Sequence, residues 1–218
     1  MELYVKWLYQ PLKGHSVWLE SDWMKIEQTI FLVEDIEKNN RTKDIYIIDE
    51  SNQTWTVKQL KKLLKKLEDE PTDLITYFDG NFNKHTKESG LGIVIYYKMN
   101  GKTHRIRRNY KVEGLLSNNE SEYASFHNLL LTLEEMGVSN QKVTFRGDSL
   151  VVLNQLAGEW PCYEEQLIYW IEKIEEKMEH LKITPNYQPV ERNENKEADQ
   201  LAKKALEGKQ INSTFTFS

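Results

Sequence analysis

Two alternating stretches joined by Asn100-Gly101 constrain the fold of this chain more than any other feature. The run LGIVIYYKMNGKTHRIRRNY reads as two β-strands that meet at this dipeptide. Asn-Gly between alternating apolar residues is the strongest short signal for a tight hairpin, because both residues readily adopt positive φ. The preceding run LITYFD reads as a further strand, so the sequence predicts three antiparallel strands in the middle of the chain.

The elements after this hairpin alternate between helix and strand. A helix is predicted over 118–136, followed by the strand KVTFRGD, a short helix from Ser149, the longer helix YEEQLIYWIEKIEEKMEH, the strand KITPNYQPV and a last helix over about 195–206. The order βββαβαβα predicts an α/β fold in which helices flank a mixed five-stranded sheet.

The first seventy residues form a separate group of predicted elements. The acidic, proline-containing stretch EDEPTD is the best linker candidate, and it separates residues 1–70, a small α/β domain, from the elements that begin at residue 74. Upstream of it we expect strands in ELYVKWLY, SVWLE and RTKDIYIID, a helix from about Trp23 to Lys38, and an amphipathic helix from Val57 to Leu67. Residues 208–218 are left as a C-terminal tail.

The helix VKQLKKLLKKL and the tryptophans give two alternatives for the small domain. The leucines of this helix predict packing on the domain's own sheet, while its lysines leave contact with nucleic acid or a partner open. Trp7, Trp18, Trp23 and Trp55 are expected in the core rather than as stacking surfaces. We expect this domain to position substrate or to mediate self-association.

Composition limits the possible partners. With 29 Lys and Arg against 34 Asp and Glu, the net charge is −5, which is not the overall basic charge of a protein that holds nucleic acid by charge alone. A local cluster (Lys84, Lys87, Arg105, Arg107, Arg108) is either a phosphate track or a solvated strand face. The single Cys162 cannot form an internal disulfide. No apolar run reaches the ~20 residues of a membrane helix, and no signal-peptide pattern opens the chain, so a cytoplasmic protein is expected.

Glu120 and Glu122 stand two residues apart in SNNESEYA, at the start of a predicted helix. At about 100° per residue, Glu122 shares the apolar stripe that contains Leu129, whereas Glu120 points about 160° away from Glu122. Ser117 and Glu120 have the spacing of a capping box, in which Glu120 bonds the Ser117 amide; Asn119 and Glu122 form a rival box. We expect Glu120 to face outward and Glu122 to face the core side, where an acid is costly unless paired.

Three further acids lie at strand ends or in a first helical turn. Asp79 ends LITYFD, Asp148 ends KVTFRGD, and Asp199 begins the last predicted helix. Each alone can be a turn former, an N-cap or a partner of the helix dipole. Open α/β sheets place sites at the carboxyl ends of their strands, and acids gathered there repel one another strongly unless cations are bound.

Four short motifs carry these acids in order: YFDG at 77–80, SNNxxEY at 117–123, GDS at 147–149 and VxRxxNxxAD at 190–199. Together, on these predicted elements, they resemble ribonuclease H of type I without its basic protrusion, and closely resemble the bacterial branch that carries an extra N-terminal domain. The resemblance covers about residues 74–207. It implies a ribonuclease H-like catalytic domain that hydrolyses the RNA strand of RNA/DNA hybrids with two Mg²⁺ or Mn²⁺ ions.

The resemblance also implies roles for individual residues. Asp79 would bridge the two ions, Asp199 would hold the ion that activates water, and Glu122 and Asp148 would hold the ion on the leaving-group side. The same motifs imply the substrate-contacting residues Ser117, Asn118, Asn119, Arg192 and Asn195, and polar groups at such positions read RNA 2′-hydroxyls. The implied partner is an RNA/DNA hybrid, and no membrane partner is expected. The oligomeric state is left open, with a monomer as one option.

Three departures from the family pattern keep alternatives open. The loop NFNKHTKESG replaces the usual glycine-rich loop after Asp79, Leu150 stands where the family often has Gln, and Arg192 is the only substitute for a histidine before Asp199. One alternative is a ribonuclease H-like nucleic-acid-binding protein with weak or no hydrolytic activity. Another is a related two-metal nuclease that acts on a different nucleic acid.

Overall fold

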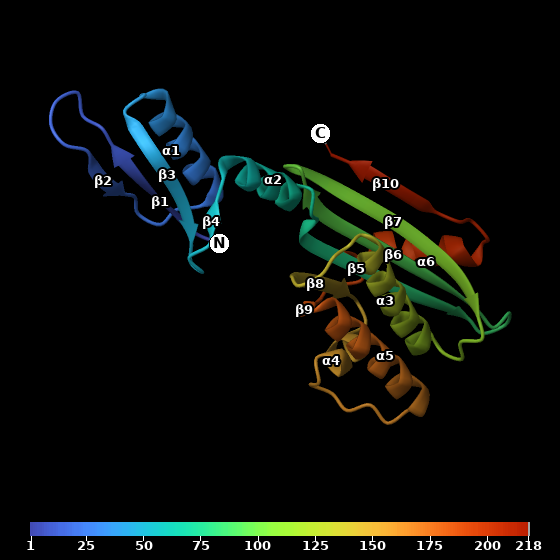
Figure 1. Cartoon of the computed structure of the whole chain (residues 1–218). Helices are drawn as coiled ribbons and strands as arrows, with labels where there is room; N and C mark the ends of the chain where they lie inside the picture. The colour runs from blue at the N-terminus through green and yellow to red at the C-terminus, as the bar shows by residue number, and fades with distance from the viewer. Residues whose placement is uncertain (218) are drawn as a thin grey trace. The chain divides into compact units, whose positions relative to one another are not determined.

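The computed structural model of this chain describes residues 1–217 and contains two compact units, Met1–Asp69 and a second one that begins at Glu70. Each has its own sheet and its own hydrophobic core (Figure 1). We refer to them as unit 1 and unit 2.

Unit 1 is a four-stranded sheet with two helices on one face. Its strands are β1 (Leu3–Tyr9), β2 (Val17–Glu20), β3 (Thr42–Asp49) and β4 (Thr54–Trp55), in the order β2-β1-β3-β4, and all neighbours are antiparallel. The helices are α1 (Ile26–Lys38) and α2 (Val57–Glu68). Their apolar residues and every second residue of the central strands form one core: Leu3, Val5, Ile26, Ile30, Val33, Ile36, Ile47 and Leu60. Leu60 is fully buried, so α2 packs on its own sheet as its leucines predict.

The prediction that all four tryptophans of unit 1 lie in the core is wrong for two of them. Trp7 and Trp55 contact the core, but Trp18 and Trp23 are 46% and 49% exposed. The reason is that both helices cover the same face of the sheet. The other face stays uncovered, and there Trp18 lies beside Tyr46 on the edge of the sheet.

Unit 2 is built on a six-stranded mixed sheet. Its strands are β5 (Thr72–Asn83), β6 (Glu88–Met99), β7 (Lys102–Glu113), β8 (Lys142–Gly147), β9 (Thr184–Pro189) and β10 (Asn212–Thr216), in the order β10-β7-β6-β5-β8-β9. The β5-β8 and β8-β9 pairs are parallel and the rest are antiparallel. The predicted hairpin is confirmed, with φ of 52° at Asn100 and 69° at Gly101 between β6 and β7.

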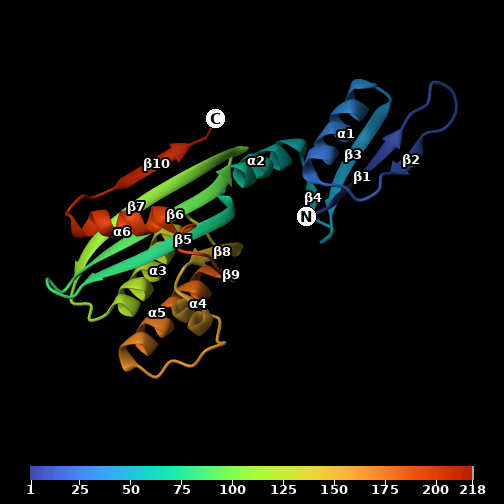
Figure 2. The same ribbon diagram turned by 180° about the vertical axis from the view of Figure 1, so that it is seen from behind.

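Helices cover both faces of this sheet. On one face lie α3 (Asn118–Glu135), α4 (Leu150–Leu156) and α5 (Glu165–Leu181), and on the other lies α6 (Lys196–Leu206), as the two opposite views show (Figure 1, Figure 2). The main core fills the space between the sheet and α3 and α5, with Phe78, Phe126 and Phe145 at its centre. The predicted α/β class with flanking helices is therefore observed.

Two glycines let the helices approach the sheet closely. A Cβ on Gly80 of β5 would collide with the backbone of Ser121 and Glu122 in α3, and a Cβ on Gly92 of β6 would collide with the backbone of Ala198 in α6. Both glycines lie next to the strand position of Asp79, which pairs with Gly92. The helix starts that carry Glu122 and Asp199 are thus brought against the strand that carries Asp79.

The prediction of a five-stranded sheet followed by a tail over 208–218 needs one correction. Asn212–Thr216 forms β10, which pairs antiparallel with β7 and adds a sixth strand. The buried Asn109 side chain of β7 fixes the preceding turn, because its Nδ2 donates to the carbonyls of Leu201 and Lys209 while its Oδ1 accepts from the Ile211 amide. In the described part of the chain, no helix is both long and apolar enough to cross a membrane.

Candidate active site

The four acids of the motifs gather where the parallel part of the sheet ends. The last pair between β5 and β8 is Tyr77 with Arg146, and β5 continues beyond it to Asn83, paired with β6. Asp79 lies on this extension and Asp148 directly follows β8. This is the edge formed by the carboxyl ends of the parallel strands, where open α/β sheets form their sites.

Asp79 is a largely buried acid surrounded by other acids. It points to the α6 face of the sheet, because it pairs with Gly92, which α6 covers. Burial, together with the charges of Asp148, Asp199 and Glu122, raises the pKa of Asp79 from 3.8 to about 8, and Arg192 opposes this shift. The carboxylate is therefore held at a cost that a bound cation would offset.

Glu122 comes from the first turn and a half of α3. Its Oε1 accepts a hydrogen bond of 3.0 Å from Asn118 Nδ2, and its Oε2 is buried without a hydrogen-bond partner. Burial raises the pKa of Glu122 to about 7, the nearby Ser149 hydroxyl lowers this pKa, and the charge of Asp148 raises it further. Ser149 lies near the carboxyl without forming a hydrogen bond to Oε2. A buried, unpartnered carboxylate oxygen is rare and costly, which distinguishes Glu122 from an ordinary capping residue.

Asp148 is held by Asn195. The Nδ2 of Asn195 donates to Asp148 Oδ1 at 2.6 Å and to the Phe78 carbonyl of β5 at 3.0 Å. Asn195 is only 1% exposed, so the prediction that it contacts substrate does not fit this structure. It instead ties the end of β8 to β5 and to the start of α6, and its Oδ1 is itself buried without a partner.

Asp199 lies in the first turn of α6 and pairs with two cations. Lys203, one turn later, approaches Asp199 Oδ2 at 2.6 Å, and Arg192 approaches Asp199 Oδ1 at 3.7 Å. Arg192 is 78% exposed in its side chain, so its guanidinium is free to meet an anion. Arg192 thus lies exposed beside Asp199, and its role in substrate contact stays a prediction.

The donor set of the four acids suits a hard divalent cation, because all eight side-chain oxygens are carboxylate oxygens. The orphaned Glu122 Oε2 and the raised pKa of Asp79 mark where positive charge is lacking. In the side-chain conformations seen here, no three Asp, Glu, His or Cys residues within 1–217 are placed to hold one ion. Asn118, Asn195 and Lys203 each hold one of the acids, and rotation of these side chains would have to accompany ion binding.

Glu120 does not face outward, and this prediction is wrong. Ser117 does cap the helix, since its Oγ accepts from the Glu120 amide at 3.1 Å. The Glu120 carboxylate, however, is 9% exposed, and it accepts from the Leu116 amide at 2.7 Å and from the Trp170 indole of α5 at 3.1 Å. Because α3 is packed between the sheet and α5, Glu120 lies in a second interface that one apolar stripe does not reveal.

The remaining predicted site residues flank the start of α3. Asn118 is exposed and its Oδ1 accepts from the Phe82 amide at 3.2 Å, so it joins the end of β5 to Glu122. Ser117 and Asn119 are half-buried. Leu150 is 51% exposed at the start of α4.

The proposed phosphate track over β7 is largely neutralised by acids. Arg105 and Arg107 both approach Glu197 Oε1, at 3.0 Å and 3.7 Å, and Arg108 pairs with Glu135. These arginines are therefore less available to phosphates than their sequence positions indicate.

The fold and the site together define the class of protein. Unit 2 has a ribonuclease H-like fold. It is similar to RNase H1 of Halobacterium salinarum NRC-1, with a TM-score of 0.52 and 24% identity, and to LC11-RNase H1 in complex with an RNA/DNA hybrid, with a TM-score of 0.55 and 24% identity. Each match covers 62% of this chain and 98% of the other protein, and at this identity it establishes the fold.

The family follows from the sequence match. A family model described as reverse transcriptase-like matches residues 77–205, and the chain belongs to this family. It is also 43% identical over 193 residues to the uncharacterized protein YpeP of Bacillus subtilis (strain 168). This alignment covers 88% of this chain and 85% of that protein. This match is longer than unit 2 and therefore extends into unit 1.

Proposed function

We propose that this chain is a divalent-metal-dependent endoribonuclease of the ribonuclease H type I class, which hydrolyses the RNA strand of RNA/DNA hybrids. One observation carries the proposal. Burial and the charges of Asp148, Asp199 and Glu122 raise the pKa of Asp79, and the four acids come from separate parts of a ribonuclease H-like fold. Such a group of carboxylates is costly for stability alone and suits the chemistry of phosphate-ester hydrolysis.

The four acids would hold two Mg²⁺ or Mn²⁺ ions. By resemblance, Asp79 would be shared between the ions, Asp199 would hold one, and Glu122 and Asp148 would hold the other. Two such ions would stabilise the attacking and the leaving oxygen of an in-line displacement.

The other residues of the site orient these acids and the substrate. Asn195 keeps Asp148 beside β5 through its bonds to Asp148 and the Phe78 carbonyl. Asn118 keeps Glu122 beside the end of β5. Asn119, half-buried next to it, offers an amide that can bond a 2′-hydroxyl or a phosphate of the RNA strand. Arg192 is exposed next to Asp199 and would neutralise a phosphate on the same side.

A second candidate is a ribonuclease H-like protein that binds hybrids and hydrolyses them weakly or not at all. The observation that favours it is that no three of the described acids, histidines or cysteines are placed to hold an ion as they stand. Leu150, exposed where the family often has a polar residue, also weakens the expected contact with a base edge.

A cleavage assay on the full chain decides between them. The substrates are an RNA/DNA hybrid with a labelled RNA strand, duplex RNA and duplex DNA, each with Mg²⁺ or Mn²⁺ and with EDTA as the blank. We expect cleavage of the hybrid only, leaving 3′-hydroxyl and 5′-phosphate ends. In Asp79→Asn we expect a loss of at least about a hundredfold, because several kcal/mol of transition-state stabilisation disappear.

Asp73→Asn is the matched control, since Asp73 lies on the same strand and is exposed in a pair with Lys98. It should cleave like the parent. Hybrid binding without cleavage by the parent under either ion would establish the second candidate, and undiminished cleavage by Asp79→Asn would remove the acid cluster from the mechanism. Equal cleavage of duplex DNA would show a nuclease with another substrate.

A further inference from the structure

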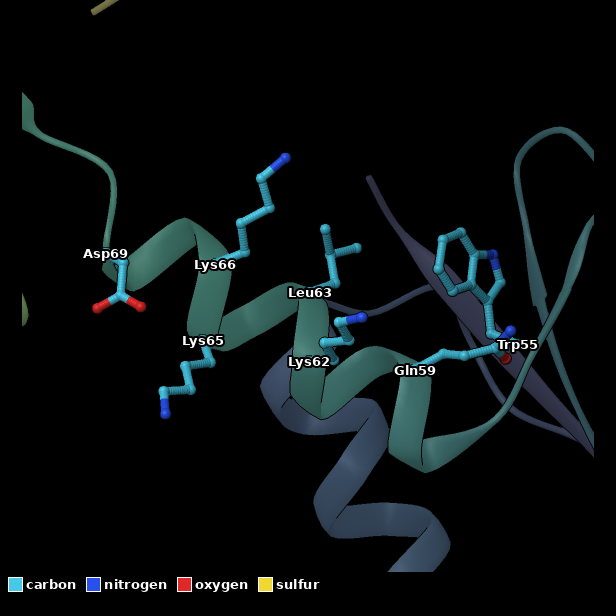
Figure 3. Close-up of a pocket in the computed structure, with 7 residues that line it drawn as sticks. All are labelled: Trp55, Gln59, Lys62, Leu63, Lys65, Lys66 and Asp69. Carbon is cyan, nitrogen blue, oxygen red and sulfur yellow. The ribbon is translucent and has the colours of Figure 1, made fainter. Parts of the chain in front are cut away.

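A cavity of about 480 Å³ opens on unit 1 along α2. Its lining consists of Trp55, Gln59, Lys62, Leu63, Lys65, Lys66 and Asp69. Figure 3 shows Trp55 on the strand side and Leu63 and Lys66 on the helix side, extending in the same direction. Residues 59, 63 and 66 recur at helical spacing, so one face of α2 forms this wall. We call the cavity the Trp55 groove.

The indole of Trp55 is fixed in place. Its Nε1 donates to Asp49 Oδ2 at 2.8 Å, and the other Asp49 oxygen accepts from the Ser51 and Gln53 amides at 2.9 Å each. Asp49 is 7% exposed. A ring held in this way loses little conformational entropy when a flat group stacks on it, and Leu63 extends the apolar surface beside it.

The rim of the groove carries uncompensated positive charge. Lys62, Lys65 and Lys66 are exposed, and within residues 1–217 none of them forms an ion pair, whereas Lys61 of the same helix pairs with Glu34 of α1. Lysines three and four apart on a helix repel one another, so α2 retains a repulsion that a bound polyanion would relieve. Asp69 is the only acid in the lining.

Figure 3 shows Lys66 on the same side of α2 as Leu63, whereas Lys65 extends to the opposite side. A fixed aromatic ring with unpaired lysines near it is a combination that binds single-stranded nucleic acid, because unpaired bases stack on the ring while the backbone phosphates meet the cations. A duplex keeps its bases paired and cannot place a base face in a concave groove. We propose that the Trp55 groove binds a single strand of nucleic acid, with a base on Trp55 and phosphates near Lys62 and Lys66. Gln59 is the only neutral polar side chain in the lining, so RNA and DNA should bind with similar affinity.

This inference is independent of cleavage and adds a second nucleic-acid site to the one proposed in unit 2. The first test measures fluorescence anisotropy of labelled oligothymidylate and oligouridylate with the full chain in EDTA. For Lys62→Gln/Lys65→Gln/Lys66→Gln we expect Kd to rise at least tenfold. The slope of log K against log salt should become smaller by about 1.4, at about 0.7 for each of the two phosphate contacts at Lys62 and Lys66.

The matched control is Lys13→Gln/Lys38→Gln/Lys43→Gln, which removes the same charge from exposed lysines of unit 1 outside the groove. Its Kd should stay within about twofold of the parent, because exposed lysines outside the groove attract the strand only through screened charge. An equal loss in both triple variants, or unchanged binding by the groove variant, would overturn the proposal.

The aromatic part is tested by Trp55→Phe, with Trp18→Phe and Trp23→Phe as controls on exposed tryptophans of the same unit. We expect a rise in Kd of at least fivefold for Trp55→Phe alone. If circular dichroism shows that Trp55→Phe is unfolded, the proposal is tested by the lysine variants. A blunt hybrid or polyglutamate that displaces the oligonucleotide at equal concentration would identify a duplex or an acidic protein as the occupant and refute the single-strand assignment.

Failure of this inference and failure of the proposed function give different results. Asp79→Asn should bind the oligonucleotides like the parent and lose cleavage. If the parent protein cleaves the hybrid but does not bind the oligonucleotides, only the present inference is removed. If the parent binds the oligonucleotides but does not cleave the hybrid, only the proposed function is removed.

Discussion

Replacing Asp79 by Asn should stabilise the ion-free protein at pH 8 by about 2 to 4 kcal/mol. The pKa of Asp79 rises from 3.8 to about 8 in the folded protein, a span of about four pH units, each worth about 1.4 kcal/mol. At pH 8, where the group is about half ionised in the folded protein, the carboxylate therefore costs about 5 kcal/mol. Asn avoids this cost but buries an amide with few partners, which takes back about 1 to 3 kcal/mol.

The sign of the pH dependence follows from which state holds the proton. Because the folded pKa is the higher one, the unfolded chain loses this proton first as the pH rises. The contribution of this group should therefore lower the free energy of unfolding of the parent progressively between about pH 4 and pH 8. At pH 5 the cost is only about 1 to 2 kcal/mol, so the parent and Asp79→Asn should have nearly equal stability there.

Urea denaturation in EDTA at pH 5 and pH 8, followed by circular dichroism, measures the difference. Both variants contain the same unit 1, so its contribution cancels in the comparison. Asp73→Asn is the control, because Asp73 is exposed and its φ of 52° is one that Asn adopts readily. Its effect should stay below about 1 kcal/mol at both pH values.

A divalent ion should remove most of this difference. At about 100 times its Kd, Mg²⁺ would stabilise the parent by about 2.7 kcal/mol and leave Asp79→Asn unchanged, so the gap at pH 8 should fall below about 1.5 kcal/mol. If the two proteins differ by the same amount at pH 5 and pH 8, the carboxyl of Asp79 is not the group that titrates and the electrostatic account of the site is refuted.

Two further substitutions test how the site is held. Glu120→Gln should lower the free energy of unfolding, measured in urea, by about 1 to 3 kcal/mol. The Leu116 amide and the Trp170 indole each donate to a different carboxylate oxygen, and Gln replaces one of these oxygens by an NH₂ group. A loss below about 0.5 kcal/mol would argue against this role. Asn195→Ala should lower hybrid cleavage at least tenfold and shift the dependence of activity on metal concentration, since Asp148 loses the amide that donates to its Oδ1. The exposed Asn193→Ala should change neither.

Much of unit 2 follows from local signals in the sequence. The Asn100-Gly101 hairpin, the start of α3 at Asn118 and the start of α6 at Lys196 lie where turn chemistry and helical periodicity place them. These signals are short-range, so the three-dimensional context does not alter them. The proximity of Asp79 and Asp148 could be expected once β5 and β8 were taken as parallel neighbours, since the carboxyl ends of parallel strands lie at one edge of a sheet.

Other features depend on contacts that no local pattern contains. The strand β10 forms because Asn109, about a hundred residues earlier, bonds the turn before it. Asn195 stands in a recognisable motif, but its sequence position does not tell whether its amide faces a substrate or the Phe78 carbonyl. Tertiary packing decides which partner the buried amide of Asn195 bonds.

The contrast between Glu120 and Glu122 shows where a helical wheel fails. The wheel assumes one apolar partner, yet α3 packs against the sheet through Ser121 and Ser125 and against α5 near Trp170. A helix between two layers has two buried faces, so an acid opposite the first stripe can still be buried. Glu120 pays for this burial with two hydrogen bonds, whereas Glu122 leaves Oε2 without one. A structural acid therefore differs from a candidate ligand in whether its buried oxygens have hydrogen-bond donors, and not in which side of the helix it lies on.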